Sequence, residues 1–246
     1  MRHVELTASS SGWRGSVVAH GHWGRPVLVF PSEAGSAWDF ETNGMVDSVQ
    51  WLVDSGRVKF YCVDSADAAT WSDRSVPLEE RARRHDQFEQ WVLQEVVPWI
   101  RDDSGGAGDV ATLGCSLGAY HAANIALRHA HVFPLALCFS GNYDPSGWHA
   151  WGDQGDAAYF HNPVQYVANL HGDHLDWLRS RLHLVLVVGQ GAWEVDPTGS
   201  LPGTHRLGEV LADKGISHEL DVWGHDVPHD WPSWRRQLAH HLPRFC

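Results

Sequence analysis

One pentapeptide of the sequence, Gly114-Cys115-Ser116-Leu117-Gly118, has the spacing of a serine nucleophile held in a sharp turn. It lies between an apolar run that ends at Leu113 and a segment of helical period that begins near Leu117. Glycine is needed two residues before and after the serine, because a side chain at either place would collide with the neighbouring backbone. The start of the helix would also point backbone N–H groups at a negatively charged oxygen. These features predict that Ser116 attacks a carbonyl carbon.

A serine nucleophile needs a histidine that removes its proton. Two histidines compete for this role, His225 and His229, in the loop that follows the last predicted strand. His229 comes directly before a helix whose start is indicated by Asp230 and Pro232. Because a loop between a strand end and a helix start can place an imidazole over the sheet, we expect His229 to be the base and His225 to brace the loop.

The histidine in turn needs a carboxylate that fixes its tautomer and orientation. Glu194 and Asp196 both follow the predicted strand at residues 182–188, in a loop that contains glycine and proline. Glu194 lies nearer to the strand end, whereas Asp196 precedes Pro197 and is biased toward a turn. We therefore expect Glu194 to be the acid, with Asp196 as the alternative. Serine, acid and histidine would then each follow a separate strand.

Short, continuous apolar runs recur along the chain, and such runs are typical of central strands in a parallel sheet. They cover residues 27–30, 58–63, 110–113, 135–139 and 182–188. A later strand at residues 217–223 alternates more in polarity and is expected to be more exposed. Residues 4–7 and 16–20 are predicted to form an antiparallel hairpin at the sheet edge.

Helical periodicity fills the segments between these strands. It predicts helices over residues 45–54, 78–102, 121–129, 204–214 and 234–241, with Pro98 kinking the second of them. Strand and helix therefore alternate, which indicates one doubly wound α/β domain over residues 1–246, with a mostly parallel central sheet and helices on both faces. Residues 141–181 are predicted to be a long irregular excursion that could serve as a lid or binding loop.

Aromatic side chains are frequent, and 14 of them are tryptophans. Trp38, Trp71 and Trp193 each lie in a loop shortly after a predicted core strand, and in open α/β sheets such loops border the ligand crevice. The excursion that could cover this crevice adds Trp148, Trp151, Tyr159 and Phe160. These positions predict an aromatic substrate pocket. The alternative is that the rings are core or loop-anchoring groups, because tryptophan is largely buried in any fold.

Composition excludes several classes of function. The 246 residues are 43% hydrophobic and 20% charged, as in an ordinary globular protein. A formal net charge of −12 disfavours a protein that binds a nucleic-acid backbone or an anionic membrane. No apolar run approaches the roughly 18 residues of a membrane span, and no signal peptide is visible. Four widely spaced cysteines without a Cys-x-x-Cys pair indicate a reduced, cytoplasmic protein.

The 18 histidines raise the question of a metal. The sequence lacks the helical His-Glu-x-x-His motif of zinc proteases. The pairs His129/His131 and His240/His241 have no cysteine or carboxylate partner at a recognised spacing. We therefore expect no metal and no cofactor.

Three groups of residues resemble the putative-esterase group of the α/β-hydrolase superfamily, which includes S-formylglutathione hydrolase (esterase D) and the antigen 85 mycolyltransferases. They are the pentapeptide around Ser116, Ser140-Gly141 after the next strand, and His229-Asp230-Trp231-Pro232-Ser233-Trp234, which looks like the group's H-x-W-x-x-W signature. The similarity extends over residues 26–242 and is greatest to a compact bacterial branch of the group. It implies the α/β-hydrolase fold and hydrolysis of a carboxylic ester through an acyl-serine intermediate.

One segment departs from the pattern of this group. Many relatives carry His-Gly after the first core strand, where it shapes the oxyanion hole, and this chain has Pro31-Ser32-Glu33-Ala34-Gly35 instead. The resemblance implies that backbone N–H groups stabilise the oxyanion. We expect Leu117 to supply one of them and Glu33 or Ala34 to supply the second.

The prediction from the whole sequence is a serine carboxylic-ester hydrolase that acts on small or aryl-bearing esters. A thioesterase or an acyltransferase could use the same three residues, because loops rather than motifs decide which acceptor is admitted. From another class, the alternative is a hydrolase fold that has lost catalysis and serves in binding. An intact set of serine, acid and histidine argues against that alternative.

Overall fold

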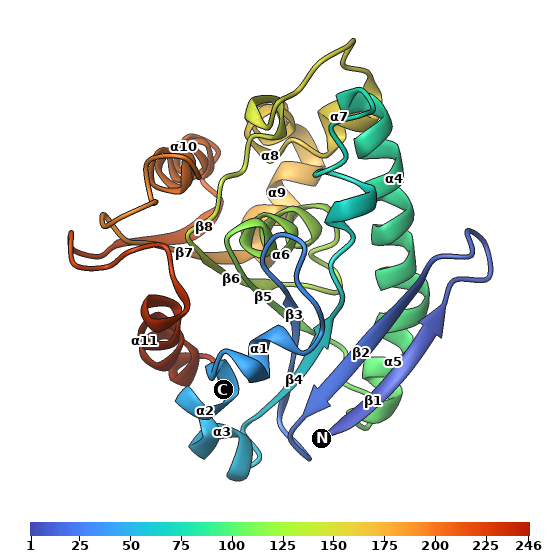
Figure 1. Ribbon diagram of the computed structural model, residues 1–246, viewed down its shortest axis with the longest axis vertical. Coiled ribbons are helices and arrows are strands. Elements are labelled where there is room, and N and C mark those ends of the chain that lie inside the picture. Colours follow the sequence, from blue (N-terminus) through green and yellow to red (C-terminus); the bar gives the residue numbers. More distant parts are fainter.

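The computed structural model describes all 246 residues and contains one eight-stranded sheet (Figure 1). The strand order is β1-β2-β4-β3-β5-β6-β7-β8. The strands are β1 Arg2–Thr7, β2 Arg14–His20, β3 Arg25–Phe30, β4 Val58–Val63, β5 Ala111–Cys115, β6 Leu135–Phe139, β7 His183–Val188 and β8 Ser217–Val222. All the strands predicted from apolar runs are therefore present, each within two residues of its predicted bounds.

The sheet is parallel except at one edge. The pairs β1–β2 and β2–β4 are antiparallel, and every pair from β4 to β8 is parallel. The predicted edge hairpin is therefore confirmed. Every residue of β4, β5 and β6 is buried, as expected for central strands, whereas no residue of β8 is fully buried.

Eleven α-helices pack around this sheet. They are α1 Asp39–Thr42, α2 Met45–Ser48, α3 Gln50–Asp54, α4 Leu78–Trp91, α5 Val97–Asp103, α6 Leu117–Arg128, α7 Asp156–Phe160, α8 Pro163–Tyr166, α9 Gly172–Arg181, α10 Ser200–Asp213 and α11 Trp231–His241. None of them has both the length and the apolar composition that crossing a membrane requires.

The helices form two layers, one on each face of the sheet. Figure 1 shows α1–α3 and α11 on one side, where they enclose a core of 22 buried residues with Val27 and Val29 of β3. Helices α4–α6 and α8–α10 cover the other side, in a core of 44 buried residues that takes Leu28 from the same strand. Successive residues of a strand point to opposite faces, so a continuous apolar run serves both cores.

Two of the predicted helices are interrupted. The segment 45–54 forms α2 and α3, with a break at Val49 beside a Ser48 hydroxyl that donates to the Met45 carbonyl at 2.7 Å. The segment 78–102 forms α4, a π-helical turn at Val92–Val96, and α5. Pro98 has no N–H and clashes with the carbonyl four residues earlier, which places the distortion one turn before the proline.

The segment 141–181 is more regular than the sequence predicts, because it contains α7, α8 and α9. Helix α4 anchors its first part. The Glu79 carboxylate accepts the N–H groups of Gly155, Ala157 and Ala158 at the start of α7, at 2.9–3.3 Å. These helices have four to ten residues and mixed polarity, so they leave no clear periodicity in the sequence.

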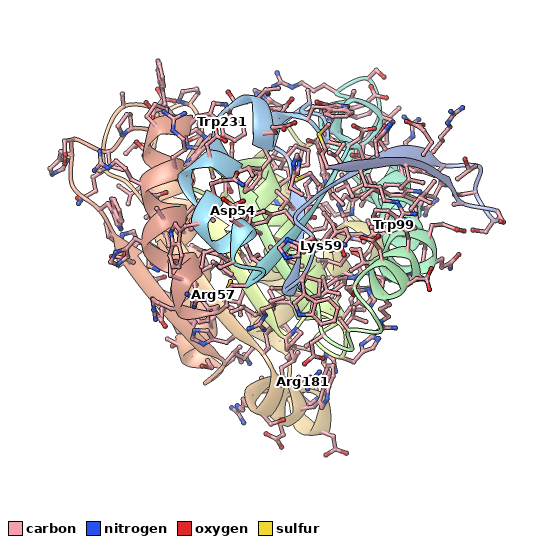
Figure 2. The ribbon with its side chains drawn as sticks, turned by 90° about the horizontal axis from the view of Figure 1, so that it is seen from below. Asp54, Arg57, Lys59, Trp99, Arg181 and Trp231 are labelled. Carbon is pink, nitrogen blue, oxygen red and sulfur yellow. The ribbon has the colours of Figure 1, made fainter.

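The amino end of β4 carries a separate ion-pair cluster. The Lys59 ammonium lies 2.7 Å from the carboxylate of Asp103, which also accepts a hydrogen bond from the Tyr61 hydroxyl at 3.1 Å. Figure 2 shows Lys59 from below, on the side of the molecule where Arg57 and Trp99 also lie. The cluster is thus at the opposite end of the strands from the loops described next.

Candidate active site

The carboxyl ends of the parallel strands meet at one edge of the sheet, and polar residues follow five of them. Glu33 comes after β3, Ser116 after β5, Ser140 after β6, Glu194 after β7 and His229 after β8. In open α/β sheets this edge is where ligands bind. Parallel topology therefore brings together residues that lie up to about 200 positions apart in sequence.

Ser116 stands in a strained turn between β5 and α6. Its backbone has φ 58° and ψ −124°, a conformation that costs a non-glycine residue free energy. A Cβ atom on Gly114 would lie 2.0 Å from the carbonyl oxygen of Gly118, and one on Gly118 would lie 2.4 Å from that of Phe30. Both glycines are therefore required sterically, and the turn projects the serine hydroxyl beyond the strand end.

The hydroxyl of Ser116 meets the imidazole of His229. Its Oγ lies 2.9 Å from Nε2, and Nδ1 of the same ring lies 3.1 Å from Oε2 of Glu194. The loops after β7 and β8 are held together by backbone hydrogen bonds, including His229 N–H to the Ala192 carbonyl at 2.9 Å. The structure thus joins serine, histidine and glutamate in one chain of hydrogen bonds.

Glu194 is fully buried and its second oxygen is also bonded. Oε1 accepts hydrogen bonds from the Ser140 hydroxyl at 2.6 Å and from the Gly189 N–H at 3.3 Å. Ser140 itself accepts the indole N–H of Trp234 at 3.1 Å, and the Trp234 ring packs edge-on against His229 at 5.0 Å. Ser140 and Trp234 thus fix both the acid and the imidazole. Sequence reasoning singled out both residues as motif members without assigning them this contact.

The two competing residues lie outside this chain. His225 is exposed, and its Nδ1 lies 3.3 Å from the carbonyl oxygen of Gln190. Asp196 is exposed and its carboxylate makes no hydrogen bond or ion pair. Of the two histidines only His229 contacts Ser116, and of the two acids only Glu194 contacts His229.

Two backbone N–H groups near the serine are free of protein partners. They belong to Leu117, the first residue of α6, and to Glu33, and both residues line the same cleft as Ser116. The N–H of Ala34 instead donates to Oδ2 of Asp67 at 3.3 Å. Of the two candidates for the second oxyanion donor, Ala34 is therefore already engaged, and Glu33 is the one that is available.

A cleft of about 290 Å³ opens beside Ser116. Most of its lining is polar and includes Glu33, Arg74 and Asn142, while Trp71 and Trp148 supply aromatic surface. Trp71 was expected here from its position after β4, and Trp148 comes from the segment 141–181.

Other aromatic residues expected at the cleft do not line it. The Trp38 ring packs near His3, with the ring centres 5.4 Å apart, and Trp193 is 60% exposed to solvent. Trp151, Tyr159 and Phe160 are likewise absent from its walls. Position after a strand end selects the correct edge of the sheet, but it does not determine where a loop directs its side chain. Fewer aromatic side chains therefore line the cleft than the sequence predicts, namely Trp71 and Trp148.

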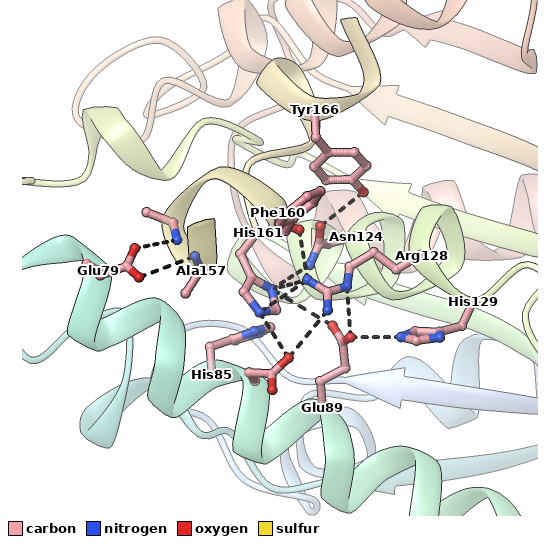
Figure 3. Close-up of polar contacts among 12 residues, drawn as sticks. Glu79, His85, Glu89, Asn124, Arg128, His129, Ala157, Phe160, His161 and Tyr166 are labelled. Atoms are coloured by element: carbon pink, nitrogen blue, oxygen red, sulfur yellow. Dashed lines mark hydrogen bonds and ion pairs between the residues drawn. The ribbon is translucent and has the colours of Figure 1, made fainter. Parts of the chain in front are cut away.

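A buried cluster behind the site has the residue types of a metal centre. His85, Glu89 and His161 offer ligand atoms that lie within 4.8 Å of one another (Figure 3). However, the Arg128 guanidinium already pairs with Glu89, Nε to Oε1 at 2.9 Å, and its Nη1 lies 3.2 Å from both ring nitrogens of His161. A metal cation there would be repelled by this fixed positive charge. The arrangement fits an internal ion-pair network better than a metal centre.

One member of this cluster makes stability dependent on pH. Burial, together with the nearby His161, His121 and Arg128, lowers the pKa of His85 well below its ordinary 6.5. Below about pH 6.5, the unfolded chain therefore binds a proton at His85 that the folded chain does not. The stability that this group contributes is full above about pH 6.5 and is lost as the pH falls, by about 1.4 kcal/mol per pH unit for one proton.

We expect His85→Gln to remove this part of the pH dependence. Urea unfolding at pH 7, 6 and 5 should show a free energy of unfolding that falls less steeply in the variant than in the unmodified protein. His225→Gln, at an exposed position, is the control and should keep the original slope. An unchanged slope in His85→Gln would mean that His85 titrates normally in the folded protein.

Comparisons with known proteins agree with this architecture. Residues 37–245 match the family described as putative esterase, and the chain belongs to that family. No curated protein sequence matches the chain. Among solved structures, it is similar to a ferulic acid esterase, with 17% identity, a TM-score of 0.74, and coverage of 99% of this chain and 95% of that one.

Two further solved structures have the same fold. An S-formylglutathione hydrolase from Agrobacterium tumefaciens has 14% identity and a TM-score of 0.73, over 98% of this chain and 92% of that one. MPT51 of Mycobacterium tuberculosis has 17% identity and a TM-score of 0.66, over 96% and 94%. The chain thus has the α/β-hydrolase fold, and both the fold class and the resemblance predicted from the sequence are confirmed. Membership of the family supports ester hydrolysis as its activity.

Proposed function

We propose that this protein is a serine carboxylic-ester hydrolase that works through an acyl-serine intermediate. The observation that carries the proposal is the continuous chain of hydrogen bonds from Ser116 through His229 to Glu194, at 2.9 and 3.1 Å. A serine nucleophile, a histidine base and a buried carboxylate in this order form the constellation that acyl transfer requires.

The roles of the residues follow from the geometry. His229 takes the proton of the Ser116 hydroxyl at Nε2 as the oxygen attacks the ester carbonyl, while Glu194 holds the Nδ1–H and stabilises the imidazolium. The N–H groups of Leu117 and Glu33 stabilise the oxyanion, and each such donor contributes about 3–4 kcal/mol to transition-state stabilisation. His229 then protonates the leaving alcohol. In the second half of the reaction it activates the water that releases the acid.

The test of this proposal is turnover of a short-chain p-nitrophenyl ester, measured before and after treatment with a serine-reactive phosphonate. We expect turnover that the phosphonate abolishes. Adding an alcohol or a thioester to the same assay distinguishes the neighbouring functions, because an acyltransferase would form a new ester and a thioesterase would prefer the thioester. Absence of turnover of both the ester and the thioester, with or without the alcohol, would favour a binding role for a fold that has lost catalysis.

The cleft favours small or aryl-bearing esters. Its volume of about 290 Å³ is at the lower end of the range for small-molecule sites, and Trp71 and Trp148 offer flat aromatic surface. In a series of esters of different acyl chain length, we therefore expect kcat/KM to peak between acetyl and butyryl, or at aryl esters, and to decline for longer chains. A maximum at decanoyl or beyond would contradict this substrate class.

Glu194 is proposed as the acid, so its removal should impair catalysis while leaving the fold intact. Glu194→Gln keeps the shape but loses the charge that selects the histidine tautomer, and kcat should fall by about 10⁴-fold. Asp196→Asn is the matched control in the same loop, and it should stay within about threefold of the unmodified enzyme, as expected for an exposed surface residue. Steady-state kinetics on p-nitrophenyl acetate measures both. A larger loss in Asp196→Asn would reverse the assignment.

We also propose that residues 1–246 act as one domain and that the segment 141–181 forms a wall of the cleft. Four of its residues line the cleft. Two of them, Trp148 and His149, have carbonyls that accept hydrogen bonds from the buried Arg81 guanidinium at 3.0 and 3.2 Å. This anchoring supports a fixed wall.

Three buried free thiols fit the cytoplasmic location expected from the sequence.

A further inference from the structure

A buried polar bridge connects the two backbone segments that carry the free N–H groups. Oδ2 of Asp67 accepts the N–H of Ala34 at 3.3 Å, in the loop after β3. Oδ1 of the same carboxylate lies 2.9 Å from Nε2 of His121, on helix α6. Ser65 binds Asp67 as well, since its hydroxyl donates to Oδ2 and accepts the Asp67 N–H at 3.0 Å.

The bridge continues into the interior. Nδ1 of His121 lies 3.0 Å from Nε2 of His85 on α4, and the two rings are stacked with an angle of 4° between their planes. Figure 3 shows His85 next to Glu89, Arg128 and His161. Asp67, His121 and His85 are 0%, 4% and 3% exposed. Bulk solvent therefore cannot replace these contacts.

Burial makes this bridge expensive to break. A carboxylate without access to water must be paired and hydrogen-bonded, and removing one partner of such a buried pair is strongly destabilising. The bridge also holds strained backbone, because Ala34 has φ 56° although it is not glycine. Such residues persist where their surroundings over-determine the conformation. The loop at Glu33–Ala34 is therefore held in position by Asp67.

The position of the bridge relates it to the reaction. Ala34 directly follows Glu33, and His121 lies one helical turn after Leu117 on α6. Asp67 thus ties the segment of one proposed oxyanion donor to the helix of the other. Donors of this kind act only within a narrow range of positions around the developing charge.

We propose that Asp67 and His121 are positioning residues for the oxyanion hole, which set the separation between the N–H groups of Glu33 and Leu117. This inference rests on the proposed function, since it assumes that Ser116 forms a tetrahedral intermediate. Neither residue touches the substrate. Their loss should therefore weaken stabilisation of the transition state while leaving the binding of the ground state largely unchanged.

Two variants break the bridge from opposite sides. Asp67→Ala removes the carboxylate, and His121→Phe keeps a ring among the neighbouring Phe30 and Phe88 rings but loses both nitrogens. Each should lower kcat on p-nitrophenyl acetate by about 10- to 100-fold, with KM changed less than about threefold. Complete removal of one oxyanion donor lowers kcat by about 10²–10³-fold, and a displaced donor should cost less. The double variant should fall little further, because both changes break one contact.

Two further variants serve as rescue and control. Asp67→Asn keeps an oxygen for the Ala34 N–H and an amide toward His121, so we expect activity close to that of the unmodified enzyme. Thr112→Val removes an equally buried hydroxyl that bonds the Ala122 carbonyl of α6 at 3.0 Å but does not touch the loop. It should leave kcat unchanged. If Asp67→Ala does not fold, Asp67→Ser replaces it, because its hydroxyl is too short to span the two segments.

The decisive readout compares two inhibitors of similar shape. Trifluoroacetophenone accepts the Ser116 oxygen at its carbonyl carbon, the carbonyl oxygen becomes an oxyanion, and the serine proton passes to His229. Acetophenone occupies the same space and adds to serine far less readily. In Asp67→Ala and His121→Phe, the inhibition constant of trifluoroacetophenone should rise by the same factor by which kcat falls, while that of acetophenone should stay within about twofold.

Equal weakening of both inhibitors would show general damage to the site and overturn the proposal, as would kcat values within twofold of the unmodified enzyme. Ser116→Ala is measured in parallel to separate the two levels of the account. If Ser116→Ala is inactive while the bridge variants are fully active, the positioning role alone is wrong. If Ser116→Ala retains activity, the proposed function itself fails.

Discussion

Ser116→Ala should reduce ester hydrolysis by about 10⁶-fold in kcat, the loss that follows when the nucleophile of a serine hydrolase is removed. The reason is that no other hydroxyl can replace it, because only the Ser116 hydroxyl, in the turn that borders the cleft, makes a hydrogen bond to His229, at 2.9 Å. The rate that remains should still be about 10³–10⁴ times that of the uncatalysed reaction in water, since the free N–H groups still stabilise an oxyanion. Initial rates on p-nitrophenyl acetate measure this.

The control for this change is Ser180→Ala, at an exposed position on α9, which should retain full activity. The Ser116→Ala protein should also unfold at nearly the same urea concentration as the unmodified enzyme, because the Ser116 hydroxyl is not the partner of a buried carboxylate or cation. A loss of activity that came with a loss of fold would not support the assignment. Retained activity in a folded Ser116→Ala protein would contradict it.

His229→Ala should be about as severe as Ser116→Ala, and the double variant should be no worse than either single one, because the residues act as a unit. The structure gives the reason, since His229 touches both the serine and the acid. His225→Ala is the matched control, because His225 lies in the same loop after β8, four residues before His229. It should stay within about threefold of the unmodified enzyme, because His225 is exposed and reaches only the Gln190 carbonyl.

A reversal of these two effects would mean that the loop after β8 moves His225 over the serine in the working enzyme.

The parts of the site that carry local sequence signals could be predicted. The glycines around Ser116 are dictated by sterics, because a Cβ atom at either position would lie only 2.0 or 2.4 Å from a backbone carbonyl oxygen. The turn therefore leaves a pattern within five residues. Asp230 caps α11 by accepting the Ser233 N–H at 2.9 Å, which marked the helix start next to His229. Parallel strands then bring such motifs to one edge without any further information from the sequence.

The parts that depend on tertiary contacts could not be predicted. Asp67 and His121 are 54 positions apart and belong to no motif, and only the packed structure shows that their side chains meet at 2.9 Å. Ala34 was a candidate donor on equal terms with Glu33, because the direction of an N–H group depends on one backbone angle. The same limit explains why Trp38 and Trp193 were wrongly expected at the cleft. Their loops follow strand ends, but their rings lie outside the cleft.

The most direct test of the central claim is the site of covalent labelling by a fluorophosphonate. The reagent should add to one residue per chain, with loss of fluoride and transfer of the serine proton to His229, and peptide mass spectrometry should place the adduct on Ser116. Labelling should stop the hydrolysis of p-nitrophenyl acetate in proportion to the fraction modified, and Ser116→Ala should not be labelled. An adduct on a different residue, or full modification of Ser116 with undiminished turnover, would contradict the account.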